Sequence, residues 1–240
     1  MTATADVLVA HQPAYLPWPG YLSRLLDVGE LVVLDHVQFS ERGRQHRNLV
    51  RGGPGRGPVR LTVPVRRVFG QPIREVELAA EPWAARHWRT LTQRYARAPY
   101  WPEHEERLAR IYATPWTHLA PLTEELTRFL LDGFGLDVRL VPSSTLAPAG
   151  ARTDMLINLC RQRGATVLRT GTGALGYLDQ QQLARHGIGL EVATYTHPPY
   201  GADRRGLLPG LSALDLLLHE GPGAADILRA GARTETKALI

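Results

Sequence analysis

Short apolar runs, each followed by a polar or glycine-rich stretch, mark the strands expected in the first and last thirds of the chain. Residues 6–10 predict a buried strand, residues 22–28 a helix that ends at Gly29, and residues 31–34 a second strand. Such a strand–helix–strand unit favours parallel pairing. Further strands are expected at 59–65, 73–78, 137–141, 166–170 and 188–194. The pattern predicts an α/β fold with a mainly parallel sheet and flanking helices.

The stretch 82–134 has a different periodicity, because its apolar residues recur at every third or fourth position. We expect several helices there, forming a helical insertion or cap within a single domain that spans residues 1–240. Later helices are expected at 154–163, at 179–186 and from Ser212, whose spacing to Asp215 is that of a capping box.

Positive charge is concentrated between residues 40 and 75, which hold nine arginines against two glutamates, in a chain of net charge +5. Residues 36–57 are polar and rich in glycine, and we interpret them as an exposed loop in which Arg42, Arg44 and Arg56 are solvated. No nucleic-acid-binding motif accompanies the arginines, and lysine occurs once, so we expect no nucleic acid as a partner. An anionic small molecule or an acidic protein fits this charge better.

The composition is that of a globular protein, with 44% hydrophobic and 21% charged residues. The single cysteine, Cys160, excludes an internal disulfide framework, and the histidines show no metal-ligand spacing. No apolar run is long enough to cross a membrane, and the first residues lack the features of a secretory signal. We therefore expect a cytoplasmic protein without a bound metal ion.

The segment HQPAYLPWPG follows the first expected strand and carries several chemically useful side chains. His11 can act as an acid or a base near neutral pH, and Gln12 carries an amide that both donates and accepts hydrogen bonds. Tyr15 and Trp18 add flat aromatic walls, and three prolines stiffen the loop. Because ligands of α/β folds bind where parallel strands end, we interpret this loop as part of a binding site. The alternative is a turn whose rings fill the core.

Polar and glycine-rich segments also follow the other expected strands and should reach the same edge of the sheet. Asp35 could orient the imidazole of His11, although it could equally cap a loop. His197 is a second titratable candidate, with a simple turn histidine as the alternative. Arg47 could bind a carboxylate or phosphate with two hydrogen bonds. The expected substrate-binding residues are Gln12, Tyr15, Trp18, Gln38, Arg47, Asn48, Gly171, Gly173, Tyr177 and Tyr200.

Cys160 raises a further hypothesis, in which it serves as the nucleophile of a thioesterase or amidase with His197 as its base. However, Cys160 shares the apolar face of an expected helix with Leu156 and Leu159. We therefore favour the alternative that it is a buried core residue.

Taken together, these segments resemble the WbqC-like protein family over about residues 7–221. The chain departs from the family pattern at His36, where an acidic residue is more usual, and at RTGTG, where Ser-Gly is more usual before the glycines. The matching blocks are HQPAYLPWPGYL at 11–22, LDHVQFS at 34–40, QHRN at 45–48, LTVPV at 61–65, RYARAPYW at 94–101, RTGTGALGYLD at 169–179, HPPY at 197–200 and LPGLSALDLLLHEG at 208–221.

Members of this family are associated with surface-polysaccharide and small-molecule biosynthetic gene clusters. The resemblance implies transfer of an acyl or aminoacyl group from a carrier-protein thioester to an amine, such as an amino sugar. On this hypothesis His11 is the general base, oriented by Asp35, while Gln12, Asn48 or backbone N–H groups near Gly171 hold the oxyanion. An acidic acyl or peptidyl carrier protein with a phosphopantetheine arm is the expected partner, and no other cofactor is implied. The remaining alternative is a non-catalytic partner in a biosynthetic complex.

Overall fold

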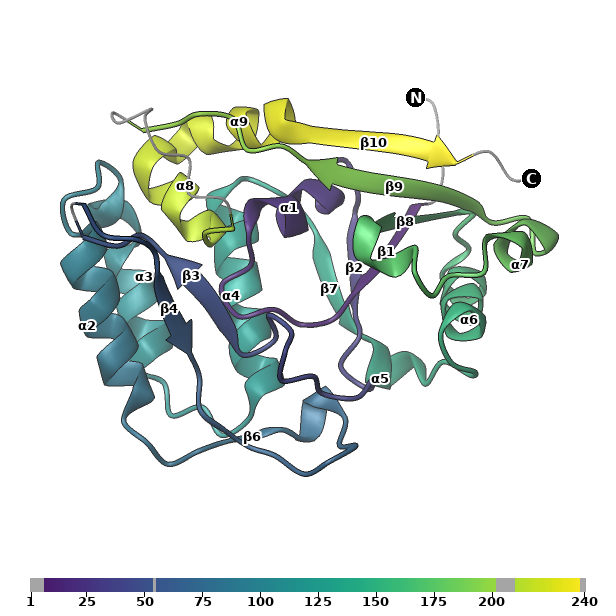
Figure 1. Cartoon of the computed structure of the whole chain (residues 1–240), viewed down its shortest axis with the longest axis horizontal. Helices are drawn as coiled ribbons and strands as arrows, with labels where there is room; N and C mark the ends of the chain where they lie inside the picture. Colours follow the sequence, from purple (N-terminus) through teal and green to yellow (C-terminus); the bar gives the residue numbers. More distant parts are fainter. Residues whose placement is uncertain (1–6, 54, 202–209, 238–240) are drawn as a thin grey trace.

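A six-stranded sheet with the strand order β10-β9-β8-β1-β2-β7 forms the centre of the computed structural model, which describes residues 7–53, 55–201 and 210–237 (Figure 1). All neighbouring strands pair in parallel except β10, which runs antiparallel to β9. This confirms the predicted α/β class. The strands are β1 (Val7–His11), β2 (Glu30–Val33), β7 (Arg139–Pro142), β8 (Val167–Gly171), β9 (Gly189–Tyr195) and β10 (Ala232–Lys237). Asp6, the first residue of the expected strand, lies outside the described residues.

The central strands are buried on both faces, as parallel strands usually are. Val9 and Leu31 pack into the larger of two cores, which the helical insertion completes, whereas Leu8 and Val32 pack into a smaller core on the other face. Gly164 adopts a left-handed conformation with φ of 66° and ends the longest helix of the smaller core, as its sequence position predicts. The helices on this side are α5 (Ser143–Leu146), α6 (Thr153–Arg163) and α7 (Gln180–Arg185).

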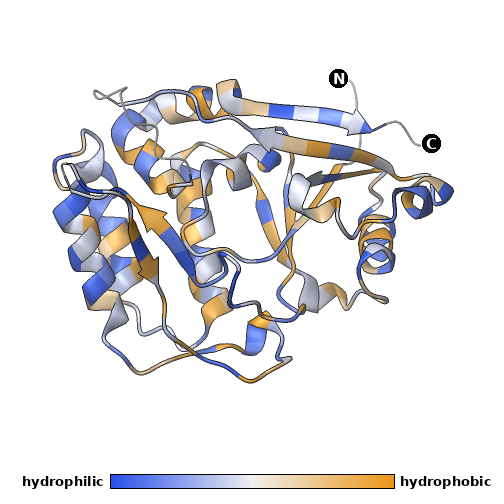
Figure 2. Cartoon of the chain, in the orientation of Figure 1, coloured by the Kyte–Doolittle hydropathy of each residue, from blue (hydrophilic) through white to orange (hydrophobic). Residues whose placement is uncertain are grey.

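The helical insertion predicted for 82–134 consists of α2 (Trp83–Tyr95), α3 (Trp101–Ala113) and α4 (Leu119–Gly133). Leu91, Leu108 and Leu126 point into the larger core and are fully buried, because they recur at the spacing that keeps one helix face inward. Trp88 stacks on Trp101 with 5.5 Å between ring centres and joins α2 to α3. Hydrophilic residues lie along the outer side of α2 (Figure 2).

The region between β2 and the insertion differs from the sequence prediction. The stretch 36–57 contains a strand in which Asn48 and Val50 are buried, so its interpretation as an exposed loop was wrong for this part. The strand expected at 59–65 is divided at Pro64, which cannot donate a ladder hydrogen bond. Two antiparallel pairs result, β3 (Arg47–Val50) with β4 (Val59–Thr62) and β5 (Val65–Arg66) with β6 (Glu77–Leu78), and β6 follows a 3₁₀ turn, η2 (Ile73–Glu75).

One helical segment also differs from its prediction, and another agrees with it. The helix expected at 22–28 is a single turn, α1 (Pro19–Leu22), followed by the 3₁₀ turn η1 (Ser23–Leu25). Ser212 caps α8 (Ala213–Glu220) as predicted, because its hydroxyl accepts the Leu214 N–H at 3.1 Å. Besides β3 and α5, the elements not anticipated include η4 (Gly221–Gly223), α9 (Ala224–Gly231) and β10. In the described part of the chain, no helix combines the length and hydrophobicity needed to cross a membrane.

Candidate functional site

The carboxyl ends of β1, β8 and β9 lie at one edge of the sheet and carry the candidate site. Val9 pairs with Arg169 in the register of β1 and β8, so His11 and Gly171 lie level with each other where the two strands end. The loop from Gln12 to Trp18 then crosses this edge, and η3 (Thr172–Ala174) follows β8. Parallel pairing thus brings together His11 and Gly171, as the sequence predicts.

His11 is a neutral imidazole in which one ring nitrogen is hydrogen-bonded to the backbone and the other makes no hydrogen bond to the described residues. Its Nδ1–H donates to the carbonyl of Gln12 at 2.8 Å, which leaves Nε2 as the acceptor nitrogen. The ring packs edge-on against Tyr21 at 4.7 Å and Trp18 at 6.0 Å between centres. Burial, helped by the positive charge of Arg24, lowers the pKa of His11 to about 3. His11 is therefore unprotonated at neutral pH.

Arg24, on η1, is a site residue that sequence analysis missed. Its guanidinium carbon lies 5.8 Å from the centre of the Trp18 ring, and its Nε atom is buried without a hydrogen-bond partner among the described residues. Burial lowers the pKa of this guanidinium. The signal in the sequence is that Arg24 is the one charged residue between Gly20 and Leu26, in an otherwise apolar segment.

Arg44 approaches the same tryptophan. Its guanidinium carbon lies 4.9 Å from the Trp18 ring centre, and Nη1 donates to the Asn48 side-chain oxygen at 2.8 Å and to the Gly210 carbonyl at 2.9 Å. The interpretation of Arg44 as a solvated side chain was therefore wrong. Burial and the charge of Arg44 both lower the pKa of His197, which packs edge-on against Tyr195 at 4.8 Å.

The glycine loop after β8 supplies space and one phenol. A Cβ atom at Gly171 would lie 2.3 Å from Nη2 of Arg24, so this glycine makes room for the guanidinium. Tyr177 is 52% exposed, and the charge of Arg24 opposes the rise that burial causes in its pKa. Gly173 is exposed, and a Cβ atom there would meet nothing within 4 Å.

Asp35 does not orient His11, which corrects the expected pair. One carboxylate oxygen accepts the Ser143 hydroxyl at 2.9 Å and the Ser144 N–H at 2.8 Å, and the other accepts the Ser144 hydroxyl at 2.6 Å. The Ser143 hydroxyl also contacts Nδ1 of His36. Asp35 therefore caps the first turn of α5, which was the alternative interpretation. The Gln12 carbonyl, and not Asp35, orients the imidazole of His11.

The amide side chains organise the loop from within. Nδ2 of Asn48 donates to the carbonyl of Leu16, whose φ of 45° is unusual for a residue with a Cβ atom. The Gln12 side-chain oxygen accepts from Nε2 of Gln45 at 2.9 Å, and Gln45 in turn accepts the Ser40 N–H at 2.8 Å. Asn48 thus holds the loop, and the Gln12 side chain is tied to the segment that contains Ser40.

Arg47 and Tyr200 are engaged elsewhere in the protein. Nε of Arg47 donates to the Gly43 carbonyl at 3.3 Å. The Tyr200 hydroxyl donates to Asp215 at 2.7 Å, and the same carboxylate accepts two hydrogen bonds of 2.8 Å from Arg51. Tyr200 therefore belongs to an ion-pair cluster that joins Arg51, the residue after β3, to α8. The structure does not bring it together with His11.

Tyr15 is fully buried and fills the core, so the expectation that it walls an open pocket was wrong. Its hydroxyl lies 2.8 Å from Nδ1 of His87 and 2.6 Å from the hydroxyl of Tyr112. The tyrosine thus ties the candidate loop to α2 and α3.

Replacing Tyr15 with phenylalanine should lower the free energy of unfolding by about 1–3 kcal/mol, because two buried polar groups lose their shared partner. Urea unfolding measures this. Tyr100→Phe is the control, because the Tyr100 hydroxyl makes no hydrogen bond to the described residues. Equal stability of the two variants would contradict the prediction.

Cys160 is fully buried in the smaller core, and burial raises its thiol pKa to about 12. A thiol in this environment stays protonated and inaccessible. The structure thus agrees with the core interpretation, and the thioesterase or amidase hypothesis loses its nucleophile.

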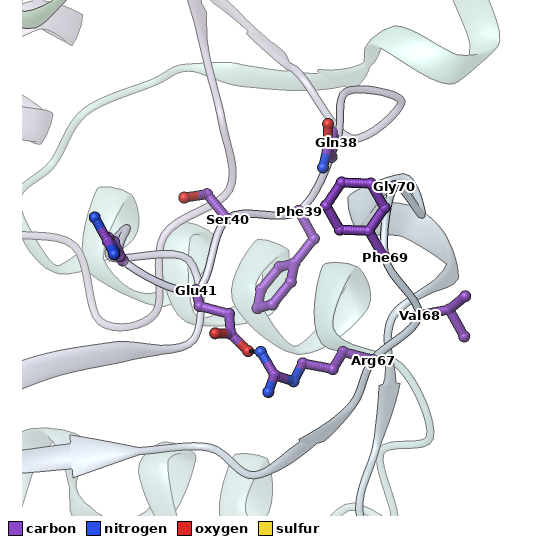
Figure 3. A pocket seen from close by; sticks show the side chains of 9 residues that line it. Gln38, Phe39, Ser40, Glu41, Arg67, Val68, Phe69 and Gly70 are labelled. Atoms are coloured by element: carbon purple, nitrogen blue, oxygen red, sulfur yellow. Dashed lines mark ion pairs between the residues drawn. The ribbon is translucent and has the colours of Figure 1, made fainter.

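A pocket of about 620 Å³ opens between two loops, 38–42 and 67–70 (Figure 3). Phe39 faces into it, and Arg67 forms an ion pair with Glu41 beside it. Phe69 is 99% exposed, which is unusual for so large an apolar side chain. Gln38 lines this pocket, and the contact from Ser40 through Gln45 connects it to Gln12.

Two buried histidines, His46 and His87, and the half-buried His11 make stability depend on pH. Burial, and after it a nearby arginine, lowers the pKa of His46 and of His87 to about 4, and that of His11 to about 3. The unfolded chain binds these protons at a pKa near 6.5, so it holds more protons than the folded chain between about pH 4 and 6.5. Stability should therefore be complete above pH 6.5 and fall as the pH decreases.

Urea unfolding at a series of pH values tests this. The free energy of unfolding should decline progressively from pH 6.5 to 4.5, and His87→Gln should reduce the slope by about one proton. A free energy that stays constant over this range would contradict the prediction.

The described residues contain no group of three or more His, Cys, Asp or Glu side chains that could hold a metal ion. The fold and the site define an α/β protein whose sheet edge carries a neutral histidine and two arginines around one tryptophan. The chain belongs to the WbqC-like protein family, whose model matches residues 12–227. It is 31% identical over 222 residues to "Uncharacterized protein Rv1507c" of Mycobacterium tuberculosis (strain ATCC 25618 / H37Rv), an alignment that covers 91% of this chain and 95% of that protein. No solved structure matches the chain.

Proposed function

We propose that this protein transfers an acyl or aminoacyl group from a carrier-protein thioester to an amine in the cytoplasm, forming an amide. The observation that carries the proposal is the state of His11. It is neutral, its Nδ1–H is fixed on a backbone carbonyl, and its Nε2 lone pair is available at the edge where ligands of parallel sheets bind.

The reaction needs one base that can receive and return a proton. The amine nitrogen attacks the thioester carbonyl carbon, and Nε2 of His11 takes a proton from that nitrogen as the C–N bond forms. The C–S bond then breaks, and His11 returns the proton to the leaving thiolate. The products are an amide and a free thiol. Its low pKa leaves His11 unprotonated at neutral pH, and the attacking nitrogen becomes a much stronger acid than a free amine as the C–N bond forms. His197 is a second candidate for proton transfer.

Exposed arginines between residues 42 and 60 support an acidic carrier as the donor. Arg42, Arg56 and Arg60 are exposed, and none of them pairs with a carboxylate of the described residues. Unpaired cations of this kind speed the approach of an acidic partner. The pocket beside Phe69 would receive part of the phosphopantetheine arm, since it is linked to Gln12 through Gln45.

Intact-protein mass spectrometry of an acylated carrier protein, incubated with this chain and a panel of amines, tests the proposal. We expect the carrier to lose the acyl mass and a new amide to form. Loss of the acyl group without an amide would indicate hydrolysis and contradict the proposal, as would no change with every acyl group tried.

The second candidate is a binding protein that transforms nothing. The pKa of about 3 favours it, because an imidazole so hard to protonate is a weak base for a free amine. Tight binding of the acylated carrier or of an amine, without turnover, would support this candidate instead.

A further inference from the structure

We infer that Arg24 is the centre of a binding site for an anionic oxygen group, a carboxylate or a phosphate, which the substrate presents beside His11. Only the assignment of this anion to the substrate rests on the proposed function. The ability to bind an anion stands on the geometry of Arg24 alone.

Arg24 has no charge partner within the described structure. Its neighbour Arg169 shows the contrast, because Nε of Arg169 pairs with Glu191 at 2.7 Å and Nη1 donates to the carbonyls of Arg24 and Leu26. The carboxylate of Asp27 is taken by Arg229 at 3.0 Å. The nearby acids are therefore occupied by other arginines. Leaving a partly buried cation without a partner costs stability, unless a ligand supplies the missing charge.

The protein leaves space for the guanidinium of Arg24. Gly171 is buried and lacks the Cβ atom that would otherwise overlap three atoms of the Arg24 side chain, at 2.3–2.9 Å. The centre of the Trp18 ring lies 5.8 Å from the guanidinium carbon. Arg24 is thus held at the ends of β1 and β8, where ligands of parallel sheets bind.

The other groups that face Arg24 supply no negative charge. His11, Tyr21 and Tyr177 are close enough for their charge to be coupled to that of Arg24, and none of them is an anion at neutral pH, because burial lowers the pKa of His11 and raises those of the two tyrosines. Arg44 lies against the same tryptophan and adds a second positive charge. The surroundings therefore carry positive charge without a balancing anion.

A guanidinium binds carboxylate and phosphate through the same pair of parallel N–H···O hydrogen bonds. The chemistry shared by the two ligands is thus a planar or tetrahedral oxyanion. Inorganic phosphate and acetate are the probes that separate them, each titrated at low ionic strength by isothermal calorimetry.

The key variant is Gly171→Ala, which displaces the Arg24 guanidinium without removing its charge. The clash involves the far end of a flexible side chain, so the fold should stay intact. We expect Gly171→Ala and Arg24→Gln to weaken binding of the preferred anion at least about tenfold, the equivalent of one charge-assisted hydrogen bond. Gly29→Ala is the matched control, because a Cβ atom there meets nothing within 4 Å, and it should bind like the original protein.

Stronger binding of phosphate would assign a phosphate group to the substrate, and stronger binding of acetate a carboxylate. Equal binding by all four proteins, or no binding of either anion, would overturn the inference. Anion binding of the expected kind without any amide product would leave this site standing and remove acyl transfer. Amide formation without Arg24-dependent anion binding would support acyl transfer and overturn the anion site.

Discussion

Replacing His11 with alanine should lower kcat for amide formation by about 10²–10⁴-fold, the usual contribution of a positioned general base. The carrier protein should bind as before, since the exposed arginines that attract it are untouched, so KM for the carrier should change little. Single-turnover mass spectrometry of the amide product measures the rate. Urea unfolding shows whether the variant remains folded.

Two controls distinguish loss of the general base from disturbance of the loop as the cause of a lower rate in His11→Ala. His186→Ala makes the same substitution at an exposed histidine and should leave the rate unchanged. Added imidazole should partly restore the rate of His11→Ala, because the small base can enter the space that the side chain vacates. A folded His11→Ala variant that retains more than about a tenth of the rate would exclude His11 as the base.

Periodicity predicted the strands that are buried on both faces and the helices that are buried along one face. β1, β2, β8 and β9 are short apolar runs because the sheet is covered on both faces. The helices of the insertion each bury one stripe. By contrast, β10 has the sequence ARTETK and is mostly exposed, so backbone pairing with β9 alone defines it. β3 was not predicted because its burial depends on pairing with β4 and on the loop that Asn48 holds through Leu16, 32 residues earlier in the sequence.

The sequence could predict which site residues meet only where the ends of parallel strands bring them to the same edge of the sheet. His11 and Gly171 meet because parallel strands end at the same edge. Asp35 also follows its strand to that edge, yet its side chain turns to Ser143 and Ser144, which lie more than a hundred residues away in sequence. Arg24 was missed because the placement of its guanidinium also depends on a distant part of the sequence. The space that it occupies is left by Gly171, a glycine in β8.

Asp215 should be the most important single charge for stability among the groups described above. Its side chain is fully buried in the first turn of α8, and it accepts two hydrogen bonds from Arg51 and one from Tyr200. Asp215→Ala should lower the free energy of unfolding by about 3 kcal/mol, near the lower end for breaking a buried ion pair. The lower end applies because Arg51 is 29% exposed and water can reach it once the carboxylate is gone. Urea unfolding at pH 7 measures the change.

Asp132→Ala provides the matched control, because Asp132 pairs with Arg107 at 2.7 Å at the surface and should cost no more than about 1 kcal/mol. A loss at Asp215 no greater than that at Asp132 would contradict the prediction. A further variant, Tyr200→Phe, tests whether Tyr200 belongs to the site or only supports stability. If Tyr200 serves stability through Asp215, then the folded Tyr200→Phe protein should form amide at the original rate, and the chemistry should depend on the group around Trp18 alone.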